Sequence, residues 1–255
     1  WLVKKNFLEK KFFLKNLKIL KKKKLDKKIS AFFLETYQGY GAIFYPKDYV
    51  QELSRWCKKN KILLVFDEIQ SGFGRTGKIF GYEYYNVKPD LVICGKGISS
   101  SLPLSAVIGK KKLLDLDKSY TSTHGGHPLC CVAAEANLDE IVRMRLVNRS
   151  KILGQILFKE VEKWKKDFPG LIPHIDGKGL VCGVFFSKTN NPENLDVEFV
   201  NQIVEKCLER GVFNIATNRG TLKIAPPLTI SKSALLEGLN VIKNVIKELY
   251  QVNET

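Results

Sequence analysis

Short apolar runs alternate along the chain with segments of helical period. Four runs have the length and unbroken apolar character of strands buried on both faces, which is typical of a parallel sheet covered by helices. Between the first two runs, residues 46–60 place Tyr49 and Trp56 on one helical face. The four runs are residues 31–35, 61–68, 90–94 and 104–109. This order predicts an α/β fold with a mostly parallel sheet.

The pattern changes in the second half of the chain. Residues 128–167 keep a helical period, with Pro128 suited to a first helical turn. Gly154 is the expected break between two helices in this stretch. Beyond it the pattern predicts strand, helix, strand and helix over residues 179–186, 197–211, 221–225 and 231–250. We therefore predict two domains: part of a large α/β domain over residues 1–154, and a small α+β domain over residues 155–255.

Positive charge is concentrated at the start of the chain. The formal net charge is +16, and residues 1–30 contribute +10 because they hold twelve Lys against Glu9 and Asp26. Such a segment indicates either a polyanionic partner, such as nucleic acid or anionic lipid, or a solvated helix face. We favour the solvated face, since no aromatic-rich RNA motif or zinc-finger spacing accompanies the lysines. Nucleic acid is therefore not an expected partner.

Cysteine usage and the absence of targeting signals favour a cytoplasmic protein. No apolar run reaches the roughly 18 residues of a membrane-spanning helix, and the lysine-rich start interrupts any signal-peptide core. The six cysteines lie mostly within apolar runs without a CxxC spacing, which favours free thiols over disulfides or zinc. His124 and His127 have no suitable third ligand nearby in the sequence, so we expect no metal site.

Two polar side chains follow neighbouring strands of the predicted sheet. Asp67 ends the second run, and Lys96 comes just after the third. Ligands of open α/β sheets bind beyond the carboxyl ends of the strands. The pair has an ordinary structural interpretation, because a strand-terminal Asp is often a turn cap and a single Lys is usually exposed. It also has a chemical one, because a lysine that forms an imine and an acid that holds a pyridinium N–H are how proteins use pyridoxal phosphate (PLP).

Three separated motifs carry a family resemblance. VFDEIQSGFGRTGK (65–78), PDLVICGKGISSSLPLSAVIG (89–109) and TSTHGGHPLCC (121–131) resemble, in order and spacing, the class III PLP-dependent aminotransferases of fold type I. The resemblance extends from about Ile29 to the end of the chain. It implies transfer of an amino group from an amine or amino acid to a keto acid or aldehyde. The same fold also carries PLP-dependent mutases and lyases.

The resemblance also implies roles for single residues. Lys96 would form the Schiff base with PLP and then move the substrate proton, and Asp67 would hold the pyridine nitrogen. Gln70 would lie by the 3-hydroxyl group of the cofactor. Thr123 matches a threonine that reaches the PLP phosphate of the neighbouring subunit, which implies a homodimer with shared active sites. Arg75 would organise its loop rather than take part in the chemistry.

The chain departs from the family pattern near the expected substrate position. It reads ETYQGYGA at residues 35–42, where many members read EPxQGEGG, so Glu35 is kept and Tyr40 replaces a second glutamate. In ornithine-type enzymes that glutamate gates an arginine in an RxxPPL motif, where this chain has Lys223. Lysine lacks the planar two-donor fork of arginine. We expect Glu35 and Lys223 near the substrate. Either Lys223 binds a substrate carboxylate less tightly than arginine would, or the glutamate-gated carboxylate site of ornithine-type enzymes is absent.

The segment before Asp67 is shorter than in full-length family members. There they carry a Gly-Thr-rich loop and a helix N-terminus that hold the PLP phosphate, and an aromatic ring that stacks on the cofactor. Nothing in residues 1–30 supplies these groups, although a helix N-terminus is the main anion site of such folds. We therefore expect the C-terminal part of a class III aminotransferase. The alternative is a catalytically incomplete fragment, or a half-subunit that needs an N-terminal partner.

Overall fold

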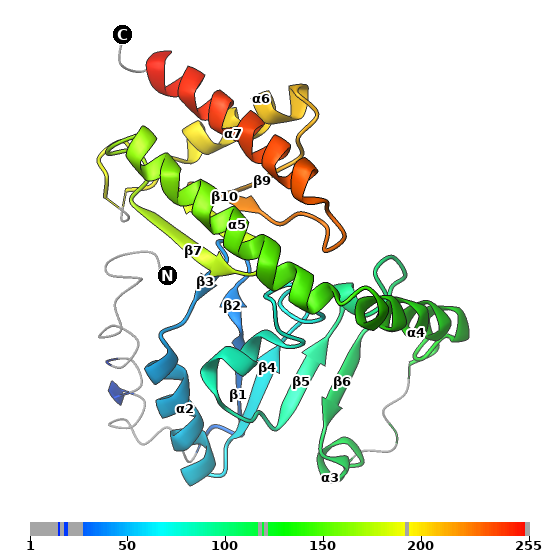
Figure 1. The fold of residues 1–255 in the computed structure, drawn as a ribbon. Coiled ribbons are helices and arrows are strands. Elements are labelled where there is room, and N and C mark those ends of the chain that lie inside the picture. The colour runs from blue at the N-terminus through cyan, green and yellow to red at the C-terminus, as the bar shows by residue number, and fades with distance from the viewer. Residues whose placement is uncertain are drawn as a thin grey trace.

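Two four-stranded sheets, a two-stranded ribbon and the helices around them make up the part of the chain that the structure describes (Figure 1). The computed structural model describes residues 28–116, 119, 122–191 and 194–252, together with Lys15, Lys18 and Ile19. Most of the lysine-rich start lies outside these residues, so the expectation for that segment stays untested. Among the helices described, none is both long and apolar enough to cross a membrane.

The first sheet has the strand order β1-β4-β5-β6. Strands β1, β4 and β5 run parallel, and β6 pairs with β5 antiparallel at the edge. Their bounds are β1 Ala31–Glu35, β4 Leu63–Asp67, β5 Leu91–Cys94 and β6 Ala106–Gly109. Helix α2 (Lys47–Lys59) packs its apolar face, with Val50 and Leu53, against this sheet. The predicted α/β fold with a mostly parallel sheet is confirmed.

The second sheet is antiparallel throughout, in the order β7-β8-β10-β9. Its strands are β7 His174–Lys178, β8 Val181–Phe185, β9 Ile215–Thr217 and β10 Thr221–Ile224. Helices α5 (Leu146–Asp167), α6 (Val197–Glu209) and α7 (Lys232–Val252) share one apolar core with this sheet. The pattern predicts β8, β10, α6 and α7 but not β7 or β9. His174 lies in β7 with its ring against Phe185, and HIDGK contains no apolar run that would indicate a strand.

A short ribbon connects the two sheets. It consists of β2 (Tyr37–Gln38) and β3 (Ile43–Phe44), which pair antiparallel directly after β1. The Phe44 N–H donates to Asp176 Oδ2 of β7 at 3.0 Å. At its tip, the ribbon comes so close to β8 that a Cβ added to Gly183 would lie 2.0 Å from the Gly41 carbonyl oxygen. The ribbon therefore begins on the first sheet and rests on the second.

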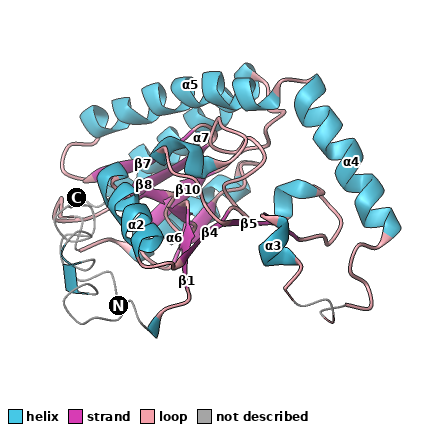
Figure 2. Cartoon of the chain, turned by 90° about the horizontal axis from the view of Figure 1, so that it is seen from below, coloured by secondary structure: helices cyan, strands magenta, loops and turns pink. Residues whose placement is uncertain are grey.

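Helices α4 (Pro128–Arg143) and α5 follow each other, and α4 reaches the outer edge of the molecule (Figure 2). The chain breaks between them at Met144 and Arg145, where Arg145 has a φ of +51°. The predicted break at Gly154 is wrong, because α5 continues through it. Gly154 lies where α5 meets the Gly179 backbone, and a Cβ there would be 2.4 Å from the Gly179 carbonyl oxygen. The division of the chain into domains near residue 154 stays a prediction.

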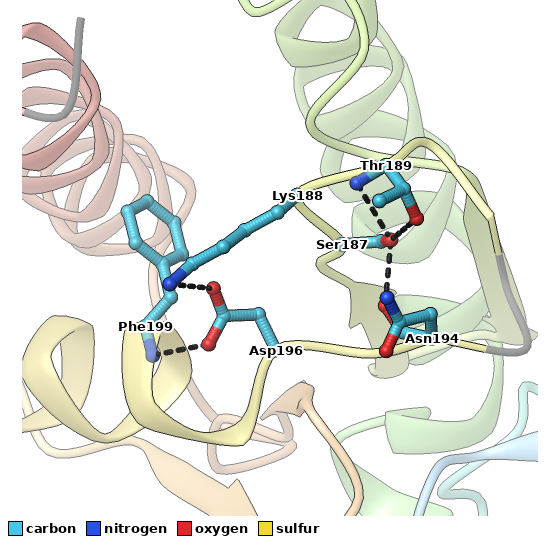
Figure 3. A network of polar contacts seen from close by, with 6 residues as sticks. All are labelled: Ser187, Lys188, Thr189, Asn194, Asp196 and Phe199. Carbon is cyan, nitrogen blue, oxygen red and sulfur yellow. Dashed lines mark hydrogen bonds and ion pairs between the residues drawn. The ribbon is translucent and has the colours of Figure 1, made fainter.

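Side-chain hydrogen bonds close the loop from β8 to α6 (Figure 3). Asp196 caps α6 by accepting the Phe199 N–H at 3.0 Å, and its other oxygen lies 3.5 Å from Lys188 Nζ. A negative N-cap satisfies a free helical N–H and complements the helix dipole. Ser187 Oγ donates to the Asn194 carbonyl oxygen at 2.7 Å. Short elements complete the fold: η2 Gly81–Tyr85, η3 Lys96–Ile98 and α3 Lys111–Leu114.

Replacing Gly154 with Ala should destabilise the protein, although Ala is the better helix former. The new methyl group would meet the Gly179 backbone, and overpacking of this kind costs about 1–3 kcal/mol of unfolding free energy. Gly238→Ala in α7 is the matched control, because nothing lies within 4 Å of the added Cβ, and there Ala should stabilise by up to about 1 kcal/mol. Urea unfolding of both variants measures the difference. Equal shifts in the same direction would contradict the close contact.

Candidate active site

Asp67 and Lys96 lie at the carboxyl ends of two hydrogen-bonded strands. The register pairs Asp67 with Glu35 on one side and with Ile93 on the other, and Lys96 follows three residues after Ile93. Asp67 is half-buried, and its Oδ1 accepts the Ile69 N–H at 2.9 Å. Asp67 therefore caps a turn, as the structural interpretation expected, and its carboxylate accepts no second hydrogen bond from any described residue.

Lys96 has a strained backbone and a free amine. Its φ is +41°, in the left-handed region that favours glycine. Non-glycine residues in such conformations gather at functional sites, where the surrounding structure maintains the strain. The side chain is exposed, and its ammonium makes no hydrogen bond or ion pair with any described residue. The loop therefore presents the amine rather than using it for packing.

A cavity of about 480 Å³ lies beside Lys96, between the two sheets. Three cationic side chains line it, and no Asp or Glu does within the described residues. Its main polar lining consists of Tyr37, Gln70, Arg75, Lys96, Asn137 and Lys223. Clefts lined by one sign of charge concentrate ligands of the opposite sign. The cavity therefore favours anionic ligands that come within reach of the Lys96 amine.

Gln70 carries a buried acceptor that nothing in the described part of the chain satisfies. Its Oε1 is buried without a hydrogen-bond partner, while its backbone carbonyl accepts from the Tyr37 hydroxyl at 3.3 Å. A buried acceptor without a donor is costly, so such groups usually bond to protein, water or ligand. A ligand with a hydroxyl group would satisfy it. The set of a free amine, a carboxylate and an unpaired acceptor therefore fits PLP, which has an aldehyde, a ring nitrogen and a hydroxyl group.

Glu68 is the residue of this site that the sequence interpretation missed. It is fully buried, and its carboxylate accepts hydrogen bonds from Thr36 Oγ1, from Ser71 Oγ at 2.7 Å, and from the backbone N–H groups of Gly81 (2.8 Å) and Tyr82 (2.7 Å). Burial raises the pKa of this carboxyl group, although the four hydrogen bonds favour its charged form. The only signal in the sequence is an acidic residue directly after a buried strand. Glu68 holds the loop that carries Gln70 and Arg75.

Arg75 joins this loop to the second sheet. Its Nη1 donates to the carbonyl oxygens of Leu180 at 2.9 Å and Pro226 at 2.6 Å. Its own carbonyl accepts from the Leu180 N–H and from Ser150 Oγ, both at 3.0 Å. Burial lowers the pKa of the guanidinium. These contacts fit the loop-organising role that was expected for Arg75.

The remaining predicted residues lie in different places. Lys223, on β10, is half-buried in the cavity wall, and burial, followed by the charge of Lys96, lowers its pKa. Glu35 is exposed at the end of β1 and does not line the cavity, and neither does Asp67. Thr123 is exposed in the loop before α4, also away from the cavity lining. The structure therefore brings Lys96, Gln70 and Lys223 together, with Asp67 at the adjacent strand end.

Comparison with known proteins identifies the family. The model of the family "Aminotransferase class-III" matches residues 2–246. The chain belongs to the class III aminotransferases. An acetylornithine aminotransferase of Caldanaerobacter subterraneus is 32% identical over 227 residues, which cover 88% of this chain and 55% of that protein. A leucine/methionine racemase of Thermococcus litoralis is 34% identical over 226 residues, which cover 87% of this chain and 50% of that protein.

Solved structures show the same fold as this class III aminotransferase chain. A Bacillus anthracis aminotransferase superposes with a TM-score of 0.85 at 30% identity, over 92% of this chain and 56% of that one. The predicted fold type I is therefore confirmed. The chain spans about half the length of the curated relatives it matches.

Replacing Glu68 with Gln should destabilise the fold by about 1.5–3 kcal/mol, the usual contribution of hydrogen bonds to a charged group. The amide nitrogen would replace one of the two carboxylate oxygens and would then face the N–H group of either Gly81 or Tyr82. Glu135→Gln, on the exposed side of α4, is the matched control and should change the unfolding free energy by less than about 0.5 kcal/mol.

The same variant has a pH signature. Because the pKa of Glu68 is raised in the folded state, the folded protein holds this proton more tightly than the unfolded chain does. Its contribution to the unfolding free energy is then largest below the unfolded pKa of about 4.3, and it declines as the pH rises to the folded pKa. In denaturant titrations across this pH interval, the unfolding free energy of the wild type should decline with rising pH, and that of Glu68→Gln should not. If the unfolding free energy of Glu68→Gln depends on pH as that of the wild type does, the pKa of Glu68 is not raised.

Proposed function

We propose that this chain is the PLP-binding C-terminal part of an aminotransferase, which moves an amino group from an amine or amino acid to a keto acid or aldehyde. The observation that carries the proposal is the unpaired Lys96 side chain, presented on strained backbone beside a cavity that no described Asp or Glu lines. The named aminotransferase relatives support the reaction class. The bound cofactor would supply the electron sink for the transfer.

The residues of the chain would then have distinct tasks. Lys96 would bind the cofactor aldehyde and afterwards move the proton at the substrate carbon. Asp67 would hold the ring nitrogen protonated from the neighbouring strand end. Gln70 Oε1 would accept from the cofactor hydroxyl, which would satisfy its buried acceptor. Arg75 and Lys223 would give the cavity the positive potential that draws carboxylate-bearing amino acids and keto acids towards Lys96.

A homodimer with shared sites is part of the proposal. Thr123 lies away from the cavity of its own chain, as expected for a residue that contacts the PLP phosphate of a partner subunit. The adjacent helix α4 exposes large apolar side chains, among them Val132 (62% exposed) and Val142 (73%). Exposed apolar surface of this kind marks protein interfaces. A cytoplasmic location, favoured by cysteines that are all free, completes the proposal.

A second candidate is a different PLP reaction at the same site. The racemase relative is as similar to this chain as the aminotransferase relative is. Racemisation, like transamination, depends on a base that moves the proton of the substrate carbon. Incubation with an L-amino acid, with and without a keto acid, separates the two: transamination consumes the keto acid, whereas racemisation yields the D-amino acid without it.

Replacing Lys96 with Ala should abolish covalent binding of PLP. Wild-type protein incubated with PLP and reduced with borohydride should carry the cofactor on the peptide that contains Lys96, as detected by mass spectrometry. Lys110→Ala, which removes a lysine from an ion pair with Asp90 (3.6 Å) at the opposite end of β5, should retain the label. Labelling that survives in Lys96→Ala at the wild-type level would refute the assignment.

The half-subunit alternative has its own support in the structure. Both edge strands of the first sheet expose large apolar side chains: Phe33 on β1 (64%), and Val107 (49%) and Ile108 (48%) on β6. Such edges are templates for further strands. Co-expression with the N-terminal half of a relative should therefore raise PLP labelling and the thermal midpoint of this chain. A chain that labels fully by itself, with no gain from the added half, would exclude this alternative.

A further inference from the structure

Gly39, at the tip of the β2–β3 ribbon, is held by charged side chains from both sheets. Its N–H donates to Glu35 Oε2 at 2.7 Å, and its carbonyl accepts from Lys223 Nζ at 2.9 Å. Glu35 ends β1 of the first sheet, and Lys223 lies in the middle of β10 of the second. Charge-assisted hydrogen bonds are stronger than neutral ones. One residue, Gly39, therefore connects the two sheets through its two peptide groups, next to Lys223 of the cavity wall.

Gly39 also lies directly against the side chain of Gln70. A Cβ added at Gly39 would be 3.0 Å from both Gln70 Nε2 and Glu35 Oε2. No side chain separates the Gly39 backbone from the Gln70 amide, so a shift of the turn changes the packing of that amide. The position of Gly39 therefore helps to determine where the buried Gln70 acceptor points.

The second sheet also contacts this turn at Tyr40, the residue after Gly39. The Arg219 guanidinium carbon lies 4.2 Å from the centroid of the Tyr40 ring, and the Tyr40 hydroxyl donates to Gln38 Oε1 at 2.7 Å. Arg219 belongs to the turn between β9 and β10, four residues before Lys223. A guanidinium over an aromatic face is a favourable contact. The β9–β10 hairpin thus holds residues 38–40 at two points.

We propose that Lys223 is a positioning residue, which holds Gly39 against Gln70 and so sets the cofactor-facing wall of the cavity, rather than the ligand of a substrate carboxylate. The ammonium is already bonded to the Gly39 carbonyl, and transfer to a substrate would leave that carbonyl without its charged donor. Tyr40, which stands where ornithine-type enzymes have a gating glutamate, contacts Arg219 instead and so reinforces the turn. The part of this inference that concerns the cofactor rests on the proposed function. The contact between Lys223 and the Gly39 carbonyl does not depend on it.

The contact is tested first without cofactor, by hydrogen–deuterium exchange of residues 37–44. Lys223→Met keeps the aliphatic stem but loses the donor to the Gly39 carbonyl, so the turn should open more readily. Exchange of the Gly39 amide, which donates to Glu35, should then be about fivefold faster, the equivalent of one net hydrogen bond. Lys223→Arg can still donate and should exchange as the wild type does. Lys188→Met, which loses the ion pair between this exposed lysine and Asp196, is the matched control and should also match the wild type. Unchanged exchange in Lys223→Met would overturn the proposal.

The consequence for the site is tested with PLP. Lys223→Met should raise the dissociation constant of PLP about fivefold, and Lys223→Arg should restore the affinity. Gly39→Ala should weaken PLP binding less in the Lys223→Met background than in the wild type, because both changes act through one turn. If Lys223→Met instead raises the KM for keto acids at unchanged PLP affinity and unchanged exchange, Lys223 is a carboxylate ligand and the proposal is wrong. Wild-type protein that takes up no PLP would refute the proposed function, while the exchange measurement would still decide the contact.

Discussion

Glu68 is buried directly after the strand end that carries Asp67, and its carboxylate gathers four hydrogen bonds from three separate segments. A buried carboxylate can be tolerated only when such donors surround it. The segments around it are therefore constrained to one arrangement. They are the start of the ribbon, the loop after β4 and the first turn of η2. Gln70 and Arg75 lie on that loop, so the cavity wall and the link to the second sheet both depend on this one side chain.

Glycines bring the two sheets close enough to share a cavity. Gly179 accommodates the backbone at Thr76, in the loop after β4, and Gly183 accommodates the ribbon at Gly41. Side chains at these joints would push the sheets apart and open the space between Lys96 and Lys223. The hydrogen bonds of Arg75 to the second sheet and its neighbouring loop then hold the two sheets at this short distance. The width of the cavity is thus determined by these close backbone contacts together with the hydrogen bonds of Arg75.

The parts of this structure that the sequence predicts are those with local signals. The strands β1, β4 and β5 are unbroken apolar runs, and the motifs around Asp67 and Lys96 identify the chemistry. Strand β7 has no apolar run, and Gly154 looks like a helix break because its close neighbour, Gly179, is distant in the sequence. Glu68 was missed because its donors are scattered between Thr36 and Tyr82. Lys223 was recognised from its motif, but its partner is a backbone carbonyl 184 residues away, which leaves no trace in side-chain patterns.

The left-handed backbone at Lys96 has a consequence for stability. A side chain in this conformation lowers stability by about 1–2 kcal/mol, whereas glycine would adopt it freely. A copy of this chain that no longer served its chemistry would become more stable by exchanging this lysine for glycine or asparagine. Lysine at this position therefore makes the chain less stable than glycine would, and that loss of stability accompanies the presentation of its amine beside the cavity.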